Sequence, residues 1–145
     1  MANGDAKLNI LITGANGSMG YYLARHIKSV APLAYITGIG RSTICHDPNI
    51  DDYYSVDLSN DEDLLLGPIL QRSAPEIVFH LAAMANVRES FLKPFSTIRN
   101  NIEGTLWLFE SMQNLGIKPK FILASTSEVY GDVAIGKNPI LETEP

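Results

Sequence analysis

The sequence contains one cysteine and lacks long apolar runs and any excess of basic residues. Cys45 alone can form neither an internal disulfide nor a thiolate metal cluster, which agrees with a reducing compartment. No run approaches the roughly 18 apolar residues of a membrane span, and residues 1–7 lack the apolar core of a signal peptide. The net charge of -5 provides no general attraction for nucleic acid or an anionic membrane. We therefore expect a cytoplasmic protein without nucleic-acid, membrane or metal binding.

Hydrophobic residues make up 46% of the 145 residues, which is enough for one domain with a sizeable core. Apolar, β-branched runs predict five strands, at residues 8–13, 33–39, 53–56, 77–83 and 120–124. Helical patterns lie between the strands, with no internal repeat or low-complexity linker. This alternation predicts an α/β fold of the Rossmann type, a doubly wound parallel sheet in the order 3-2-1-4-5. Ligands of such sheets bind at the carboxyl ends of the strands, beside the switch point between strands one and four.

A glycine-spaced turn directly follows the first predicted strand, and a helical pattern from Tyr21 to Val30 follows the turn. Gly14 allows a sharp exit from the strand, Gly17 allows backbone to approach a pyrophosphate, and Gly20 allows the helix to pack on the sheet. The unpaired amides at the helix start would then hold the anion. The spacing predicts a dinucleotide site, although glycine-rich turns also close hairpins.

The end of the second predicted strand carries Arg41 and Ser42, where a carboxylate would grip the two ribose hydroxyls of NAD. A guanidinium beside a hydroxyl suits a 2′-phosphate, so the sequence favours NADP, with NAD as the alternative. Arg41 as a solvated loop residue also remains open. Asp57 and Leu58, after the third strand, are candidate contacts of the adenine, and Asp57 is equally suited to a turn.

Two further helices are expected. Ser59 and Glu62 have the spacing of a capping box, and Gly67-Pro68 should kink or split the helix that follows. The second helix begins at Pro94 and ends at Gly116. Its apolar positions Phe95, Ile98, Ile102, Leu106, Phe109 and Met112 recur at helical steps.

Four motifs together resemble the extended branch of the short-chain dehydrogenase/reductase family, the nucleotide-sugar epimerases and dehydratases. They are Thr13-Gly14-Ala15-Asn16-Gly17-Ser18-Met19-Gly20, Phe79-His80-Leu81-Ala82-Ala83, Asn101-Ile102-Glu103-Gly104-Thr105 and Ser125-Thr126-Ser127-Glu128-Val129-Tyr130-Gly131. The resemblance runs from Leu8 to Pro145. It implies that Ala82 and Ala83 pass beneath the cofactor and that Asn101 ties the central helix to the turn after strand four.

The predicted cofactor-binding residues are Gly14, Asn16, Gly17, Ser18, Met19, Gly20, Arg41, Ser42, Asp57, Leu58, Leu81, Ala82, Ala83 and Asn101. His80 lies inside an apolar strand, so we expect a hydrogen-bonded core histidine rather than a catalytic one.

The resemblance also implies a substrate, a sugar attached to a nucleoside diphosphate, and two catalytic residues. Thr126 matches the hydroxyl that hydrogen-bonds the reacting sugar oxygen, and Glu128 matches the carboxylate that removes a proton beside the 4-keto group in dehydratases. The Thr-Ser-Glu form resembles GDP-mannose 4,6-dehydratases and also UDP-glucuronate decarboxylases. A 4,6-dehydratase is favoured, with a decarboxylase, a 4-keto-sugar reductase or an epimerase as alternatives. Ordinary turn hydroxyls and a solvated Glu128 are the structural alternative.

The sequence departs from the family in having no Tyr-x-x-x-Lys pair, which handles the proton in these enzymes. We therefore interpret residues 1–145 as the N-terminal, cofactor-binding part of a longer enzyme, truncated before the last strands and the substrate lobe, and expect no turnover by this part. A non-catalytic NADP-binding sensor or scaffold module is the alternative. An exposed fifth strand and the family's dimer helices predict a homodimer through the helix from Pro94 to Leu115, with Phe91, Leu92 and Trp107 either assisting or packing in the core.

Overall fold

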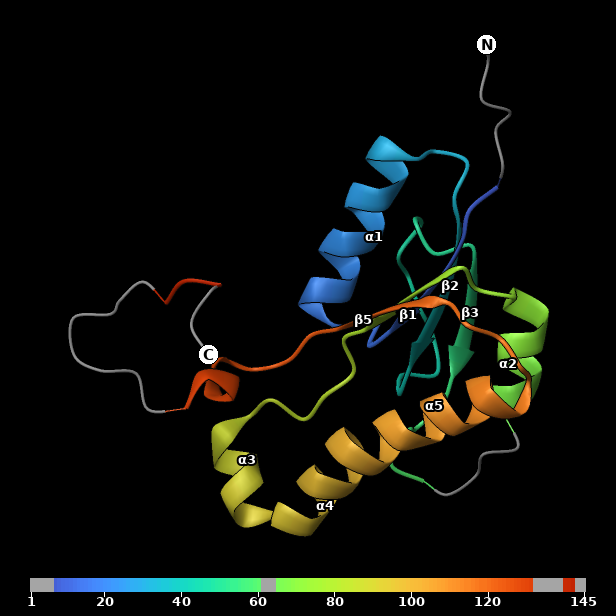
Figure 1. Ribbon diagram of the computed structural model, residues 1–145. Coiled ribbons are helices and arrows are strands. Elements are labelled where there is room, and N and C mark those ends of the chain that lie inside the picture. Colours follow the sequence, from blue (N-terminus) through green and yellow to red (C-terminus); the bar gives the residue numbers. More distant parts are fainter. Residues whose placement is uncertain (1–6, 61–64, 132–139, 143–145) are drawn as a thin grey trace.

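The computed structural model describes residues 7–60, 65–131 and 140–142, without the side chains of Ser127 and Glu128. Its centre is a five-stranded parallel sheet that lies between helices on its two faces (Figure 1). The strands are β1 (Asn9–Thr13), β2 (Tyr35–Gly40), β3 (Asp52–Ser55), β4 (Ile77–His80) and β5 (Lys120–Leu123). Their order is β3-β2-β1-β4-β5, so the predicted topology is confirmed.

The sheet register brings the carboxyl ends of the three central strands to one level. Thr13, the last residue of β1, pairs with Ile39 of β2 and with His80 of β4. The chain leaves β1 toward β2 on one side and later returns to place β4 on the other. The turns after β1, β2 and β4 therefore meet at one edge of the sheet, where the topology predicts a ligand site.

Two separate clusters of buried side chains cover the two faces of the sheet. Helix α1 (Ser18–Val30) packs on one face, while α2 (Leu66–Ser73) and α5 (Gly104–Asn114) pack on the other. The cluster under α1 contains Ile10, Ile12, Ala15, Ala24, Ile27, Ala34 and Ile36. The cluster under α2 and α5 contains Leu11, Ile39, Val56, Leu58, Leu66, Ile69, Leu70, Val78, Leu108 and Met112. Strand β1 supplies both clusters because its successive side chains point to opposite faces.

The start of α2 differs from the prediction. The Ser59 hydroxyl donates to the Asp57 carboxylate (2.7 Å), and Glu62, the other member of the predicted capping box, lies outside the described residues. Helix α2 begins at Leu66, which places Pro68 in its first turn. Proline is tolerated there because the first amides of a helix have no intrahelical acceptor, so Gly67-Pro68 neither kinks nor splits the helix.

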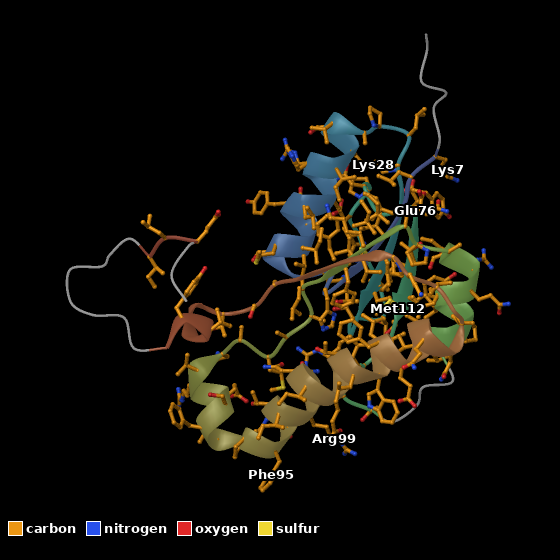
Figure 2. The ribbon with its side chains drawn as sticks, in the orientation of Figure 1. Lys7, Lys28, Glu76, Phe95, Arg99 and Met112 are labelled. Carbon is orange, nitrogen blue, oxygen red and sulfur yellow. The ribbon has the colours of Figure 1, made fainter. Side chains whose placement is uncertain are left out.

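The long helix predicted from Pro94 is present as three consecutive pieces, after the short α3 (Val87–Leu92). The pieces are α4 (Pro94–Ile98), a π-helical segment η1 (Arg99–Glu103) and α5. Five of the six apolar positions that recur at helical spacing are exposed, Phe95, Ile98, Ile102, Leu106 and Phe109, and only Met112 is buried. Figure 2 shows Phe95 projecting away from the body of the molecule and Met112 lying toward the sheet. The predicted apolar face is therefore the outer one.

The inner face of this helical run uses smaller or polar residues as well as apolar ones. Its buried residues are Asn100, Gly104, Leu108, Ser111 and Met112. On α1, Tyr21 and Val30 are exposed. Within the described residues, no helix has the length and apolar character needed to cross a membrane.

Candidate functional site

A pocket of about 290 Å³ opens at the carboxyl edge of the sheet. Its walls come from the turns after β1, β2 and β4, from the segment after β3 and from η1. It is lined by Gly14, Asn16, Gly17, Ile39, Gly40, Arg41, Ser42, Val56, Leu58, Leu81, Ala82, Ala83 and Asn100. The pocket thus lies at the switch point between β1 and β4, where the sheet topology predicts a ligand site.

The glycines of the turn after β1 bring bare backbone to this pocket. Gly14 has a φ of 71°, and a Cβ on it would lie 2.9 Å from the Ala82 nitrogen. The Gly17 amide donates to the Gly14 carbonyl (2.9 Å) and closes the turn. A Cβ on Gly20 would lie 2.5 Å from the same carbonyl oxygen. Only glycine at these positions lets α1 and the turn after β4 approach this closely.

The amino-terminal end of α1 is open toward this turn. Gly17 is its N-cap residue, no side chain among the described residues caps the first amides, and the first turn contains no acidic residue. Ser18 and Met19 are exposed on that first turn and lie outside the pocket lining. Unpaired amides and the positive end of the helix dipole favour an anion at such a position.

The loop after β2 is held by side chains that donate to its carbonyl oxygens. Tyr53 Oη donates to the Ser42 carbonyl (2.8 Å), and Asn16 Nδ2 donates to the Ile44 carbonyl (3.0 Å). Ser55 Oγ donates a longer hydrogen bond to the Arg41 carbonyl (3.4 Å). Arg41 and Ser42 are exposed and line the pocket, whose described lining contains no carboxylate.

The segment after β3 forms the apolar end of the pocket. Val56 and Leu58 line it and are buried in the core beneath. Asp57 does not line it; its Oδ1 accepts hydrogen bonds from the Ser59 amide (3.0 Å) and hydroxyl (2.7 Å). These are the hydrogen bonds of a turn residue, and the contact of Asp57 with the adenine stays a prediction.

Asn100 also lines the pocket, and the sequence analysis did not select it. It is 7% exposed, and no described hydrogen bond engages its carboxamide. Its neighbour Asn101 bridges η1 to the turn after β4, accepting from the Met84 amide (2.7 Å) and donating to the Met84 carbonyl (3.2 Å). The expected tie between the central helix and this turn is confirmed, while Asn101 itself does not line the pocket.

His80 is 2% exposed and is hydrogen-bonded on both ring nitrogens, as a core histidine should be. Nδ1 contacts Thr13 Oγ1 (2.7 Å), and Nε2 contacts Thr105 Oγ1 (2.9 Å). Burial lowers the pKa of His80 to about 4, so the ring is neutral at pH 7. Thr13 Oγ1 also accepts from the Ala82 amide (3.2 Å), which links the histidine to the pocket wall.

The predicted catalytic segment lies outside the described pocket lining. After β5 the chain leaves the sheet and reaches the short 3-10 helix η2 (Ser127–Tyr130), as Figure 1 shows. Thr126 is exposed, and its carbonyl accepts from the Val129 amide (3.3 Å). The Glu128 side chain lies outside what the structure describes. The catalytic roles of both residues stay predictions.

Four lining residues were not among the predicted site residues: Ile39, Gly40, Val56 and Asn100. Gly40 and Val56 adjoin predicted site residues at strand ends, so strand boundaries offered a signal for them. Asn100 offered none, because its inward direction depends on the π-helical turn. In the described part of the chain, no group of three or more metal-ligating side chains comes together.

Comparison with known proteins gives a family match over nearly the whole chain. The model of the NAD dependent epimerase/dehydratase family matches residues 10–145. A dTDP-D-glucose 4,6-dehydratase of Dictyostelium discoideum is 34% identical over 89% of this chain and 31% of that protein. A GDP-mannose 4,6-dehydratase of Vibrio cholerae is 34% identical over 96% of this chain and 40% of that protein. The chain thus spans less than half the length of these relatives.

Solved structures agree with the sequence matches. A Thermotoga maritima UDP-glucose 4-epimerase with UDP-glucose is 28% identical, with a TM-score of 0.74 over 88% of this chain and 41% of that one. A Thermus thermophilus UDP-glucose 4-epimerase in complex with NAD is 26% identical, with a TM-score of 0.76 over 94% of this chain and 43% of that one.

Proposed function

The chain belongs to the NAD dependent epimerase/dehydratase family, and on this premise we propose that residues 1–145 are the N-terminal cofactor-binding domain of a longer nucleotide-sugar enzyme. When bound, the cofactor would take a hydride from C4 of the sugar and later return it. Both relatives named above extend well beyond the part that this chain matches, which supports a further substrate lobe. The single cysteine supports the cytoplasm as its compartment.

The observation that carries the proposal is the uncapped end of α1 beside the pocket. Gly17, the N-cap residue of α1, lines the pocket together with Gly14, and no described side chain caps the first amides of the helix. Such amides are suited to the two phosphates of a dinucleotide, which need hydrogen-bond donors and a positive field. The apolar end at Val56 and Leu58 is suited to a flat base, and the buried Asn100 carboxamide offers that base a donor and an acceptor.

We propose NADP as the cofactor, with NAD as the alternative. Arg41 and Ser42 line the pocket, and no carboxylate among the described lining residues would repel a 2′-phosphate. A guanidinium can bind that phosphate through two charge-assisted hydrogen bonds.

Titration of the chain with NADPH and NADH tests this choice. We expect tighter binding of NADPH, and an Arg41→Ala variant should lose about tenfold or more in NADPH affinity with a much smaller loss for NADH. Arg25→Ala, which removes an exposed arginine of α1 outside the pocket, is the matched control. Tighter binding of NADH by the unmodified chain would contradict the choice.

For the reaction of the full enzyme, we propose a 4,6-dehydratase. The Thr126 hydroxyl would hydrogen-bond the sugar oxygen at C4, and the Glu128 carboxylate would take the proton from C5 of the 4-keto sugar. The C5 electron pair then forms the C5–C6 double bond as hydroxide leaves C6 and is protonated to water. Similarity to 4,6-dehydratases supports this choice, and similarity to epimerases keeps epimerisation as an alternative. Residues 1–145 have no Tyr-x-x-x-Lys pair to move the C4 hydroxyl proton, so we expect no turnover by them alone.

The role of Glu128 is tested in the full enzyme. Glu128→Gln should slow formation of the 4-keto-6-deoxy product about a hundredfold, because an amide cannot act as a general base. NMR of the sugar product measures this, and Glu110→Gln, an exposed change on α5, is the control. Dehydration at the normal rate in Glu128→Gln would show that another group removes the proton.

A non-catalytic NADP-binding module is the second candidate. Its support is the lack of a Tyr-x-x-x-Lys pair within residues 1–145. The reading frame of the gene separates the two candidates. A Tyr-x-x-x-Lys pair encoded shortly after Pro145 supports the enzyme, and a natural stop codon supports the module.

We also propose that the protein forms a homodimer through the outer face of α4, η1 and α5. This face exposes Phe95, Ile98, Ile102, Leu106 and Phe109 at successive helical turns. Phe91 and Leu92 of α3 are exposed as well, whereas Trp107 packs against the core cluster under α5. A continuous exposed apolar face of this kind is typical of a protein interface.

A further inference from the structure

Strand β2 has glycine at two successive positions on the same face, and the ring of Tyr53 covers both. Gly38 pairs with Tyr53 in the register of β2 and β3. A Cβ on Gly38 would lie 3.2 Å from Tyr53 Cδ2, and a Cβ on Gly40 would lie 2.8 Å from Tyr53 Oη. The ring therefore lies along β2 toward the carboxyl end of the strand. The ring can lie there only because Gly38 and Gly40 have no side chains.

The Tyr53 hydroxyl consequently reaches the end of β2, where the Arg41–Ile44 loop begins. It donates to the Ser42 carbonyl at 2.8 Å. Burial, and to a smaller extent the neighbouring Cys45 thiol, raises the pKa of Tyr53, so the phenol keeps the proton that it donates. Tyr53 does not line the pocket, and any effect of its hydroxyl on a ligand must pass through the loop.

We propose that Tyr53 is a positioning residue that sets the preference for dinucleotides with a 2′-phosphate, by holding the Ser42 carbonyl away from the phosphate position. This rests on the proposed binding of NADP by Arg41 and Ser42. A carbonyl oxygen carries a partial negative charge, so an unheld peptide at Ser42 could turn that oxygen toward a bound anion. A held loop also loses less conformational freedom when the ligand binds. NADH lacks the 2′-phosphate and gains little from either effect.

The chain offers a matched pair of variants. Tyr53→Phe removes the hydroxyl and keeps the ring over Gly38 and Gly40. Tyr54→Phe removes the neighbouring hydroxyl, which donates to Asp52 Oδ2 (2.8 Å) and does not reach the loop. We expect Tyr53→Phe to weaken NADPH binding about fivefold, as for one lost hydrogen bond, and NADH binding less than twofold. Tyr54→Phe should change neither. Unchanged NADH affinity also shows that the Tyr53→Phe pocket is folded.

A double-mutant cycle with Arg41→Ala shows whether Tyr53 acts through the loop. If it does, the two losses of NADPH affinity should be less than additive, because without the guanidinium the 2′-phosphate is held less firmly beside Ser42. Equal losses for NADPH and NADH, an unchanged ratio of the two affinities, or additive losses in the cycle would each overturn the inference. NADH binding as tight as NADPH binding by the unmodified chain would instead overturn the proposed cofactor, and the inference with it.

Discussion

The hydrogen bonds around His80 determine which ring nitrogen carries the proton. The Thr105 hydroxyl donates to the Asn101 carbonyl (2.8 Å), so toward His80 it can only accept. His80 must therefore donate from Nε2, and Nδ1 must accept from the Thr13 hydroxyl. Thr13 in turn accepts from the Ala82 amide. One directed chain of hydrogen bonds thus runs from the pocket wall after β4 to the π-helical segment, and it requires a neutral histidine.

This arrangement predicts a pH dependence of stability. An unfolded histidine titrates near 6.5, whereas the pKa of His80 in the fold is about 4. Between these values the unfolded chain takes up a proton that the folded chain does not. The free energy of unfolding should therefore fall by up to about 3 kcal/mol as the pH drops from 6.5 to 4, and His80 should add no further change below 4.

Urea unfolding at several pH values, followed by circular dichroism, measures the contribution of His80. His80→Gln cannot titrate in this range, so its stability should fall less steeply than that of the unmodified chain between pH 6.5 and 4. If the free energy of unfolding falls equally with pH in the unmodified chain and in His80→Gln, His80 is not the titrating group.

The role of a residue could be predicted where it follows from the strand or helix directly beside that residue in the sequence. The three glycines follow a strand and precede a helix, and His80 lies in an apolar strand, so their steric and core roles followed from position. Asn100 differs, since a polar residue one place before another asparagine gives no sign of burial. Asp57 was left with two roles because a carboxylate after a strand is suited to a ligand and to a turn alike.

At the scale of elements, the helix from Pro94 shows what apolar periodicity leaves undetermined. Apolar residues occupy both of its sides, so the pattern identifies a helix without showing which side meets the sheet. The inner side is determined by close approach: a Cβ on Gly104 would lie 2.9 Å from the Leu58 carbonyl oxygen. That contact brings the helical run onto the segment after β3, next to the pocket. Such a contact joins residues distant in sequence and was not predictable.

Gly104→Ala tests this packing. Gly104 has a φ of -58°, so alanine adopts the backbone without strain and its helix propensity is better. The clash with the backbone of Leu58 should outweigh that gain and destabilise the chain by about 1–3 kcal/mol. Gly67→Ala in α2, where a Cβ meets nothing within 4 Å apart from its chain neighbours, creates no such clash and should change the stability by less than about 1 kcal/mol. Thermal unfolding measures both changes, and equal losses would contradict the packing argument.

At the scale of the whole molecule, the alternation of strands and helices was sufficient to predict the sheet order. Right-handed crossovers leave few arrangements of five parallel strands, and the observed order is the predicted one. The pocket position follows from that order and needs no side-chain detail. The outer surface does not follow from it, because no rule of strand connection determines which apolar residues remain exposed.

The exposed face of α4, η1 and α5 predicts association of the chain. Ile102 is 54% exposed in the middle of this face, so Ile102→Glu would bury a charge in the proposed interface and should convert a dimer to a monomer. Val30→Glu is the matched control, because Val30 is 67% exposed on α1, which packs on the other face of the sheet. Size-exclusion chromatography with light scattering measures both variants. A monomeric unmodified chain at high concentration would contradict the proposed homodimer, while a dimer that persists in Ile102→Glu but not in Val30→Glu would place the interface on α1.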